Sequence, residues 1–461
     1  GTTMLARMGA LVEVVSQPIY VAMFGLAGFG LYAVLWSAVN LLENIFDLGM
    51  TSAMQRTVPQ AKDDSEALSA LRAALLVGVL PCLAVAFIVF LYAPQIAPLL
   101  NVRPEDEALL VPAVRLFVWA LPLWALVEVA TSAVRARHVF GAEIRLRIFW
   151  EQLIRLVLAL VFWGMGWGLS GLFIAHMCSL LATALLSVRL LARHYPLRRM
   201  GQGRWFGSMF FETVQAGLAV LPANVLARLF GDAPTIILNQ LLPGAAGAKI
   251  AGLFTIGRKI SSIVQVVRTA FVYVLAPLAS SALRNDIAQV RAIYGYATRL
   301  ITVIVLPLAM VLSGGVLPLL AMFGAEARGA RVAVLLLIAG RALEAVVGIS
   351  VPVQQVASTH QRQIVASLSG FVIACLAGWA LVGFDALGGV SAAVAIGLVS
   401  AALIPMIQLW RFDHIQPFDG GFLRLLGVSL LCGAGGMALA LLSGALPNWI
   451  ALPVLPLLAA G

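Results

Sequence analysis

Long apolar runs follow one another along the whole chain, and this feature limits the possible folds more than any motif does. A run of about 20 apolar residues, wound as a helix, crosses the hydrocarbon core of a bilayer. Hydrophobic residues make up 62% of the 461 residues and charged residues only 11%, whereas soluble domains carry roughly 25% charged residues. The runs are also too long for the strands of a membrane barrel. The sequence therefore predicts an all-α integral membrane protein.

We expect about fourteen transmembrane helices from the length and hydropathy of these runs. They are placed near residues 3–24, 29–54, 68–92, 107–134, 143–167, 169–192, 209–242, 247–278, 290–318, 330–357, 362–383, 387–410, 423–443 and 446–461. The spans near 209–242 and 247–278 are longer than a bilayer requires, so part of each is expected to extend beyond it. The chain begins without a methionine and ends inside a short apolar run, so the sequence is expected to be a trimmed one.

Basic residues are concentrated in the loops that follow the even-numbered spans, and the richest of these loops is 193–208. The loops after odd-numbered spans hold few. Because Lys and Arg accumulate on the cytosolic side of membrane proteins, both termini are predicted to be cytosolic. The net charge of +10 is explained by this orientation, so no nucleic-acid partner is expected.

The two halves of the chain share a short pattern. An apolar segment meets a Gly/Ala-rich turn and then Gly30-Leu31-Tyr32 in the first half, or Gly252-Leu253-Phe254 in the second. With an even number of spans in each half, this predicts a parallel internal repeat. The expected organisation is two six-helix lobes, 1–192 and 209–415, joined by the basic linker 193–208 and followed by two appended helices in 416–461.

Polar side chains recur inside the expected spans, where a charge costs roughly 2.5–3.5 kcal/mol to insert. In the span 29–54, Asn40, Glu43, Asn44 and Asp47 share one helical face, with Glu43 deep in the membrane and Asp47 near its cytosolic end. A buried ion pair is the alternative interpretation of Glu43. The residues predicted to line a cavity or to couple an ion are Asn40, Glu43, Asn44, Glu13 and Gln265.

Other charges are spaced as structural ion pairs, which allow a polar stripe to enter the membrane. Arg147, Glu151 and Arg155 form one i, i+4 row. Arg228 and Asp232 have the same spacing. Asp47 is expected to order the end of its helix and to pair with Arg56.

The span 247–278 is basic instead. Arg258 and Gln265 share a face of it, with Lys259 and Arg268 at its borders, and Arg341 stands three residues before Glu344 in the span 330–357. Arg258, Arg268 and Arg341 have few acidic partners nearby in the sequence, so a role in lining a cavity and a role in pairing both stay open.

Motifs of enzymes are missing from the sequence. It contains no P-loop, HExxH or GxSxG, and its loops are too short to form a catalytic domain. The four cysteines have neither CxxC spacing nor histidine neighbours, so no metal site is expected. We therefore expect a transporter or flippase with no catalytic residues and no cofactor, and a channel is less favoured.

The stretch from Gly30-Leu31-Tyr32 through Asp47-Leu48-Gly49 and Thr51-Ser52-Ala53 to Arg56 resembles the second helix of the multidrug/oligosaccharidyl-lipid/polysaccharide exporter superfamily. It is most similar to the branch of polysaccharide biosynthesis proteins and O-antigen flippases. Ala276-Pro277-Leu278-Ala279 is similar to the end of that family's eighth helix. The resemblance implies two six-helix lobes around a central cavity that opens alternately to each side of the bacterial inner membrane.

The resemblance also implies the substrate, an undecaprenyl-diphosphate-linked oligosaccharide, moved at the expense of an H⁺ or Na⁺ gradient. A lipid diphosphate with a sugar headgroup requires a basic, hydrogen-bonding cavity, while its tail stays among the membrane lipids. The residues predicted to contact the diphosphate are Arg258, Lys259, Arg268, Arg341, Arg7 and Arg228.

Three alternatives stay open at this point. A multidrug antiporter of the same superfamily would bind cations, which the many arginines disfavour, although Glu43 and Asp47 suit it. A lipid II flippase would be expected to begin with an arginine-rich first helix, which is not found in this sequence. A membrane scaffold without transport activity is the third.

Overall fold

The computed structural model describes residues 2–443, apart from 140, 142–143, 203–204, 284–286, 358–359 and 419. Within its helices the side chains of 2–11, 13–14, 144, 148, 270, 272–283, 287, 355–357, 360–361 and 363 are likewise not described. The described residues form helices, turns and short connections and contain no strand. The prediction of an all-α membrane protein is confirmed.

The helices pack into two compact units, 1–252 and 253–461. In chain order, the helices of the first unit are α1 (Thr2–Phe46), α2 (Met50–Thr57), η1 (Val58–Gln60), α3 (Asp64–Ala73), η2 (Ala74–Val79), α4 (Leu80–Leu91), α5 (Ala93–Ile96), η3 (Ala97–Leu99), η4 (Pro104–Asp106), α6 (Glu107–Phe117), α7 (Ala120–Ala136), η5 (Ile144–Trp150), α9 (Glu151–Gly164), α10 (Gly168–His194), η6 (Leu197–Arg199) and α11 (Ser208–Leu241). The expected lobe boundaries at 192 and 209 stay a prediction.

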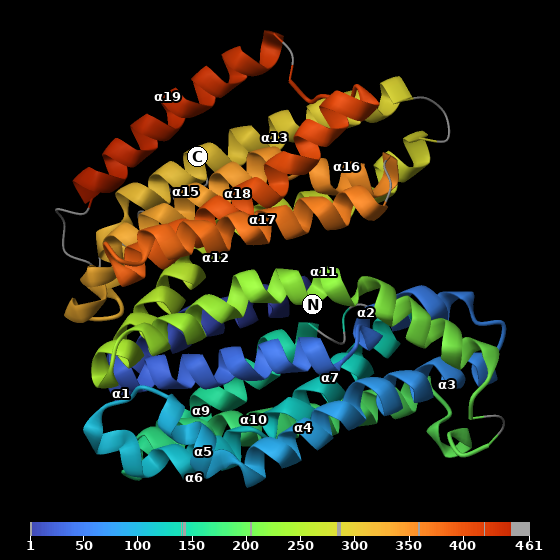
Figure 1. Cartoon of the computed structure of the whole chain (residues 1–461), viewed down its shortest axis with the longest axis vertical. Helices are drawn as coiled ribbons and strands as arrows, with labels where there is room; N and C mark the ends of the chain where they lie inside the picture. The colour runs from blue at the N-terminus through green and yellow to red at the C-terminus, as the bar shows by residue number, and fades with distance from the viewer. Residues whose placement is uncertain are drawn as a thin grey trace. The chain divides into compact units, whose positions relative to one another are not determined.

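The helix α12 (Gly244–Leu283) begins in the first unit and continues into the second. The remaining helices of the second unit are α13 (Ile287–Gly314), α14 (Val316–Ala321), η7 (Ala325–Ala330), α15 (Arg331–Val347), α16 (Ser350–Ala357), α17 (His360–Leu381), α18 (Ala386–Asp413) and α19 (Gly420–Ser443). Within this unit, α18 packs against α15 and α17, and α13 packs against α15 and α19 (Figure 1).

The element α1 contains two helices, because the chain reverses direction at Gly25. This glycine has φ 73° and ψ 163°, a conformation that residues with a Cβ rarely adopt. The rings of Tyr20 and Tyr32 lie 6.4 Å apart, whereas a continuous helix would separate them by about 18 Å at 1.5 Å per residue. The two arms of α1 therefore run side by side, as the separate predicted spans 3–24 and 29–54 require.

Eleven elements of the described chain are long and apolar enough to cross a membrane. That count treats the two arms of α1 as one element and does not include α9, which continues from η5. Each expected span up to 423–443 has a helical counterpart, whereas the last one, 446–461, lies outside the described residues. At about 1.5 Å per residue, the 40 residues of α12 exceed the thickness of a bilayer, in agreement with the predicted extension.

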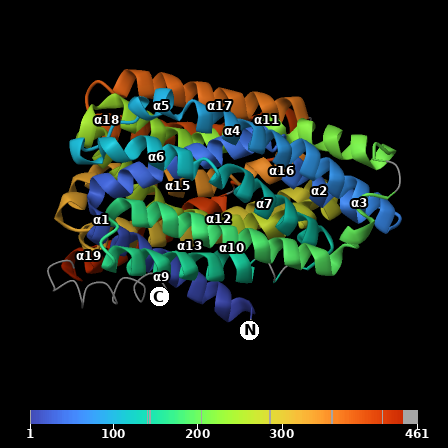
Figure 2. The ribbon, with the colours of Figure 1, turned by 90° about the horizontal axis from the view of Figure 1, so that it is seen from below.

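The first unit has a buried interior of aromatic side chains. Phe117 of α6 packs edge-on against Tyr32 and Phe173, with ring centroids 6.0 Å and 5.7 Å apart. The helices α9 and α10 lie side by side (Figure 2), and α11 packs along α1 and α2. This packing brings the polar face of the second arm of α1 close to α7 and α11.

Candidate functional site

The second arm of α1 places the Glu43 side chain in the interior of the first unit, where the residue is 2% exposed. Its electrostatic neighbours are the carboxylates of Glu128 and Asp47 and the guanidinium groups of Arg228 and Arg147. Within the described chain, no hydrogen bond or ion pair of 4 Å or less to its carboxyl group is found. Glu43 is thus a buried acid whose charged neighbours interact with it only at longer range.

Asn40 and Asn44 lie on the same part of α1. Asn40 is buried, with 7% exposed. With its amide oriented to satisfy both neighbours, Asn44 donates to the Asn224 carbonyl oxygen and accepts from Arg228 Nε, each at 3.3 Å. Arg228 also lies 3.8 Å from Asp232, through its Nη1 atom and the Asp232 Oδ2 atom. The polar face of α1 therefore meets a polar stripe of α11.

Asp47 lies in the turn between α1 and α2. Leu48 and Gly49 both have positive φ values, 49° and 74°. The Thr51 backbone N–H donates to Asp47 Oδ2 at 3.1 Å, which satisfies one of the free N–H groups at the start of α2. Arg56 is exposed in the last turn of α2, and among the described residues it forms no ion pair with Asp47. The expected Asp47–Arg56 pair is therefore not found, because α2 carries Arg56 toward the surface while Asp47 stays buried.

Glu128 of α7 is the partner of Arg147. The Nη2 and Nη1 atoms of Arg147 donate to Oε1 and Oε2 of Glu128 at 2.7 Å and 3.1 Å. The guanidinium carbon also lies 4.5 Å from the centroid of the Trp124 ring. Arg147 is also one of the charged groups that interact with Glu151, its predicted neighbour in the i, i+4 row, although η5 is a π-helical segment. Glu128 of α7 is thus paired with an arginine of a different helical segment, η5.

Glu151 and Arg155 begin a buried chain of polar groups. The two side chains form an ion pair within α9, and both residues are less than 9% exposed. Arg155 Nη1 donates to the Tyr32 hydroxyl at 3.1 Å, and that hydroxyl lies 2.8 Å from Nδ1 of His176. Because the Tyr32 oxygen accepts from Arg155, its own proton is available to Nδ1, which places the imidazole proton on Nε2. Pattern analysis of the sequence did not detect this link between α1, α9 and α10.

In the second unit, Glu344 of α15 accepts from two arginines. Arg268 Nη1 donates to Oε1 and Arg341 Nη1 donates to Oε2, both at 2.9 Å. The three side chains are only 19%, 12% and 8% exposed. One carboxylate cannot neutralise two guanidinium groups, so the cluster keeps a surplus positive charge. Arg268 passes close to Gly348, where an added Cβ would lie 3.0 Å from its Nε.

The remaining predicted residues are scattered. Arg258 and Lys259 are half-buried on α12, and Gln265, also half-buried, accepts from Thr269 Oγ1 through its backbone carbonyl at 2.9 Å. The side chains of Arg7 and Glu13 lie outside the described residues. The structure therefore brings together Arg268 with Arg341, and Arg228 with Asn44 and Asp232.

Several solved structures share this arrangement of helices. The inward closed conformation of the lipid II flippase MurJ superposes with a TM-score of 0.73 at 11% identity, over 100% of this chain and 97% of that one. An inward-facing multidrug resistance MATE transporter superposes with a TM-score of 0.67 at 15% identity, over 88% of this chain and 94% of that one. A transporter from Pyrococcus furiosus, which is described as a member of the MOP superfamily with a binding pocket of reverse polarity, superposes with a TM-score of 0.63. The identity is 15%, over 90% of this chain and 94% of that one. The fold is thus that of the multidrug/oligosaccharidyl-lipid/polysaccharide transporters.

The family follows from the sequence itself. Residues 23–323 match the model of the family described as polysaccharide biosynthesis protein. The comparison with curated proteins gives no match. The chain belongs to the polysaccharide biosynthesis protein family, and the resemblance drawn from its second helix is confirmed.

Proposed function

We propose that this protein is a flippase that moves an undecaprenyl-diphosphate-linked oligosaccharide, such as a polysaccharide or O-antigen repeat unit, across the bacterial inner membrane. In this proposal it works by alternating access with both termini in the cytosol, and an H⁺ or Na⁺ gradient drives it. It performs no covalent chemistry on its substrate. The observation that carries the proposal is the cluster of Arg268 and Arg341 on Glu344, together with membership of the family.

The chemistry of that cluster suits a diphosphate. Arginine presents a planar set of N–H donors that matches phosphate oxygens, and such hydrogen bonds are about twice as strong as those between neutral groups. Glu344 holds both guanidinium groups in place and neutralises only one of them. Arg268 Nε is buried and has no hydrogen-bond partner in the described part of the chain, so the guanidinium group is not fully satisfied by Glu344.

Glu43 is the group we assign to ion coupling. It is buried, carries no direct ion pair in the described residues and is surrounded by both acidic and basic groups. Binding of a proton or a sodium ion would neutralise it at little structural cost. The same feature favours the second candidate function, a multidrug antiporter, because a buried acid can also bind a cationic drug.

Complementation of a flippase-deficient strain tests the proposal, with surface polysaccharide as the readout. The wild-type gene should restore the polysaccharide, whereas Arg268→Gln and Arg341→Gln should abolish it at normal protein level. Arg362→Gln is the matched control, since Arg362 pairs with Asp413 at 3.4 Å away from the cluster. Full export by both cluster variants would refute the assignment of the diphosphate site.

Deletion of the gene separates the alternatives. If the protein is a flippase of lipid-linked oligosaccharides, these lipids should accumulate on the cytosolic leaflet when the gene is deleted. Drug sensitivity without such accumulation would instead identify a multidrug antiporter. Loss of viability with accumulation of lipid II would identify a lipid II flippase.

A further inference from the structure

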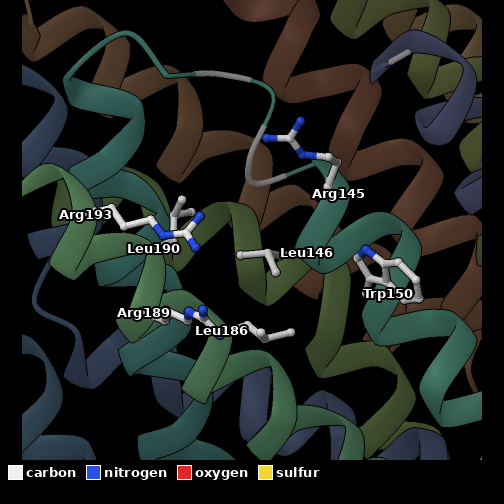
Figure 3. A pocket seen from close by; sticks show the side chains of 7 residues that line it. All are labelled: Arg145, Leu146, Trp150, Leu186, Arg189, Leu190 and Arg193. Carbon is white, nitrogen blue, oxygen red and sulfur yellow. The ribbon is translucent and has the colours of Figure 1, made fainter.

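A second basic site lies in the first unit, at the end where α10 finishes and α9 begins. The pocket is lined by Arg145, Leu146 and Trp150 of η5 and by Leu186, Arg189, Leu190 and Arg193 of α10. Figure 3 shows the two sets of side chains projecting from the two neighbouring segments. Three arginines thus line the pocket together with three leucine side chains, which are called its leucine floor.

The arginines of this pocket are available to a ligand. Arg145, Arg189 and Arg193 are all exposed, and in the described part of the protein none of them forms an ion pair or a side-chain hydrogen bond. Three neighbouring positive charges repel one another. A bound anion would offset that repulsion and would receive several charge-assisted hydrogen bonds.

The surface that continues from the pocket is apolar. On α10, Leu181 and Leu185 are 48% and 65% exposed, and on α9, Val157 and Val161 are both 49% exposed. Exposed aliphatic side chains on membrane-spanning helices contact lipid tails. Trp150, 47% exposed at the pocket, is a residue type that gathers at the level of the lipid headgroups. The basic pocket therefore stands at the end of an exposed apolar surface of α9 and α10.

We propose that this pocket binds the phosphate headgroup of an anionic phospholipid whose acyl chains lie along the exposed face of α9 and α10. Basic pockets between transmembrane helices bind anionic headgroups in this way. Phosphate binds the arginines, and the leucine floor and Trp150 contact the glycerol region of the lipid. The lipid bound here is a structural partner of the first unit and is separate from the substrate that contacts Arg268 and Arg341.

The test uses the full chain, purified in detergent and titrated with dioleoyl phosphatidylglycerol or dioleoyl phosphatidylcholine. Bound lipid is counted by native mass spectrometry, and the melting temperature is followed in parallel. Wild-type protein should retain phosphatidylglycerol, and its melting temperature should rise when this lipid is bound. Phosphatidylcholine should not be retained and should not raise the melting temperature. Arg189→Gln/Arg193→Gln should weaken phosphatidylglycerol binding by about tenfold or more. The double variant Arg189→Lys/Arg193→Lys keeps both positive charges, so its affinity for phosphatidylglycerol should fall less.

Arg198→Gln/Arg199→Gln is the matched control, because these two arginines are also exposed and lie in the nearby η6. It removes the same charge and should leave binding unchanged. Equal loss in both double variants would overturn the proposal in favour of attraction by net charge alone. Unchanged binding in the Arg189/Arg193 variant would also overturn it. Inorganic phosphate that stabilises the protein as well as phosphatidylglycerol does would show a free-anion site instead.

Discussion

Asn101 and Asn239 are joined by hydrogen bonds that run in both directions. The Asn101 backbone N–H donates to Asn239 Oδ1 at 3.0 Å, and Asn239 Nδ2 donates back to the Asn101 carbonyl oxygen at 2.8 Å. Asn101 also uses its side chain, donating to the Asn239 carbonyl oxygen and accepting from the Gly244 backbone N–H. This pair fixes the connection between α11 and α12 to the loop that precedes η4.

Replacement of Asn239 should destabilise that connection. Asn239→Ala removes three hydrogen bonds from a fully buried side chain, two with the Asn101 backbone and one from Gln240 Nε2, and each unsatisfied group costs about 1–3 kcal/mol. The melting temperature of the purified protein should fall by several degrees. Gln240→Ala is the comparison, since Gln240 is exposed and its Nε2 donates to the Leu99 carbonyl oxygen at 2.6 Å and to Asn239 Oδ1 at 3.4 Å, so this variant leaves the two Asn101–Asn239 hydrogen bonds of the Asn239 side chain in place. An Asn239→Ala protein as stable as the control would contradict this role.

Removal of the Glu344 carboxylate, which both arginines share, should lower the stability of the protein more than removal of one arginine. Glu344→Gln leaves both Arg268 and Arg341 half-buried without an anionic partner, and breaking a buried ion pair costs about 3–5 kcal/mol. In Arg341→Gln, by contrast, Glu344 keeps its hydrogen bond to Arg268. Thermal unfolding should therefore rank the proteins as wild type, then Arg341→Gln, then Glu344→Gln. The reverse order of the two variants would mean that Glu344 does not hold the cluster together.

A glycine contact should be sensitive to a single methyl group. A Cβ added at Gly30 would overlap the Ala248 carbonyl oxygen and lie 3.1 Å from the Gly252 nitrogen, so the two helix backbones would have to separate. Gly30→Ala should lower stability by about 1–3 kcal/mol, measured by thermal unfolding. Gly427→Ala is the matched control, because no atom lies within 4 Å of its added Cβ and alanine favours a helix. Equal melting temperatures for the two variants would show that the close contact at Gly30 does not limit the size of its side chain.

Glu43 should affect coupling more than folding. Glu43→Gln breaks no direct hydrogen bond or ion pair in the described residues and removes repulsion from Glu128 and Asp47. The variant should melt at or slightly above the temperature of the wild type. In proteoliposomes, its flipping of lipid-linked sugar should no longer respond to an imposed pH or sodium gradient. Glu105→Gln, at an exposed carboxylate at the start of the span Pro104–Ala136, should keep the full response. A gradient response that survives in Glu43→Gln would assign coupling to another group.

The sequence by itself determined the class of fold and most of the spans. Apolar runs are local properties, and a helix satisfies its own backbone hydrogen bonds inside a membrane, so length and hydropathy suffice to locate it. Spacing likewise indicated the Glu151–Arg155 pair, because residues four apart on one helix are neighbours whatever surrounds them. The short Gly30 motif was enough to indicate the family.

Only the tertiary structure decided which polar groups meet across helices. Glu128 with Arg147, Arg268 with Glu344, and Tyr32 with His176 each join side chains from different helices. Their meeting depends on how the helices rotate and pack, which hydropathy does not encode. A buried charge selects its partner by distance in space, and that distance exists only once the helices have packed.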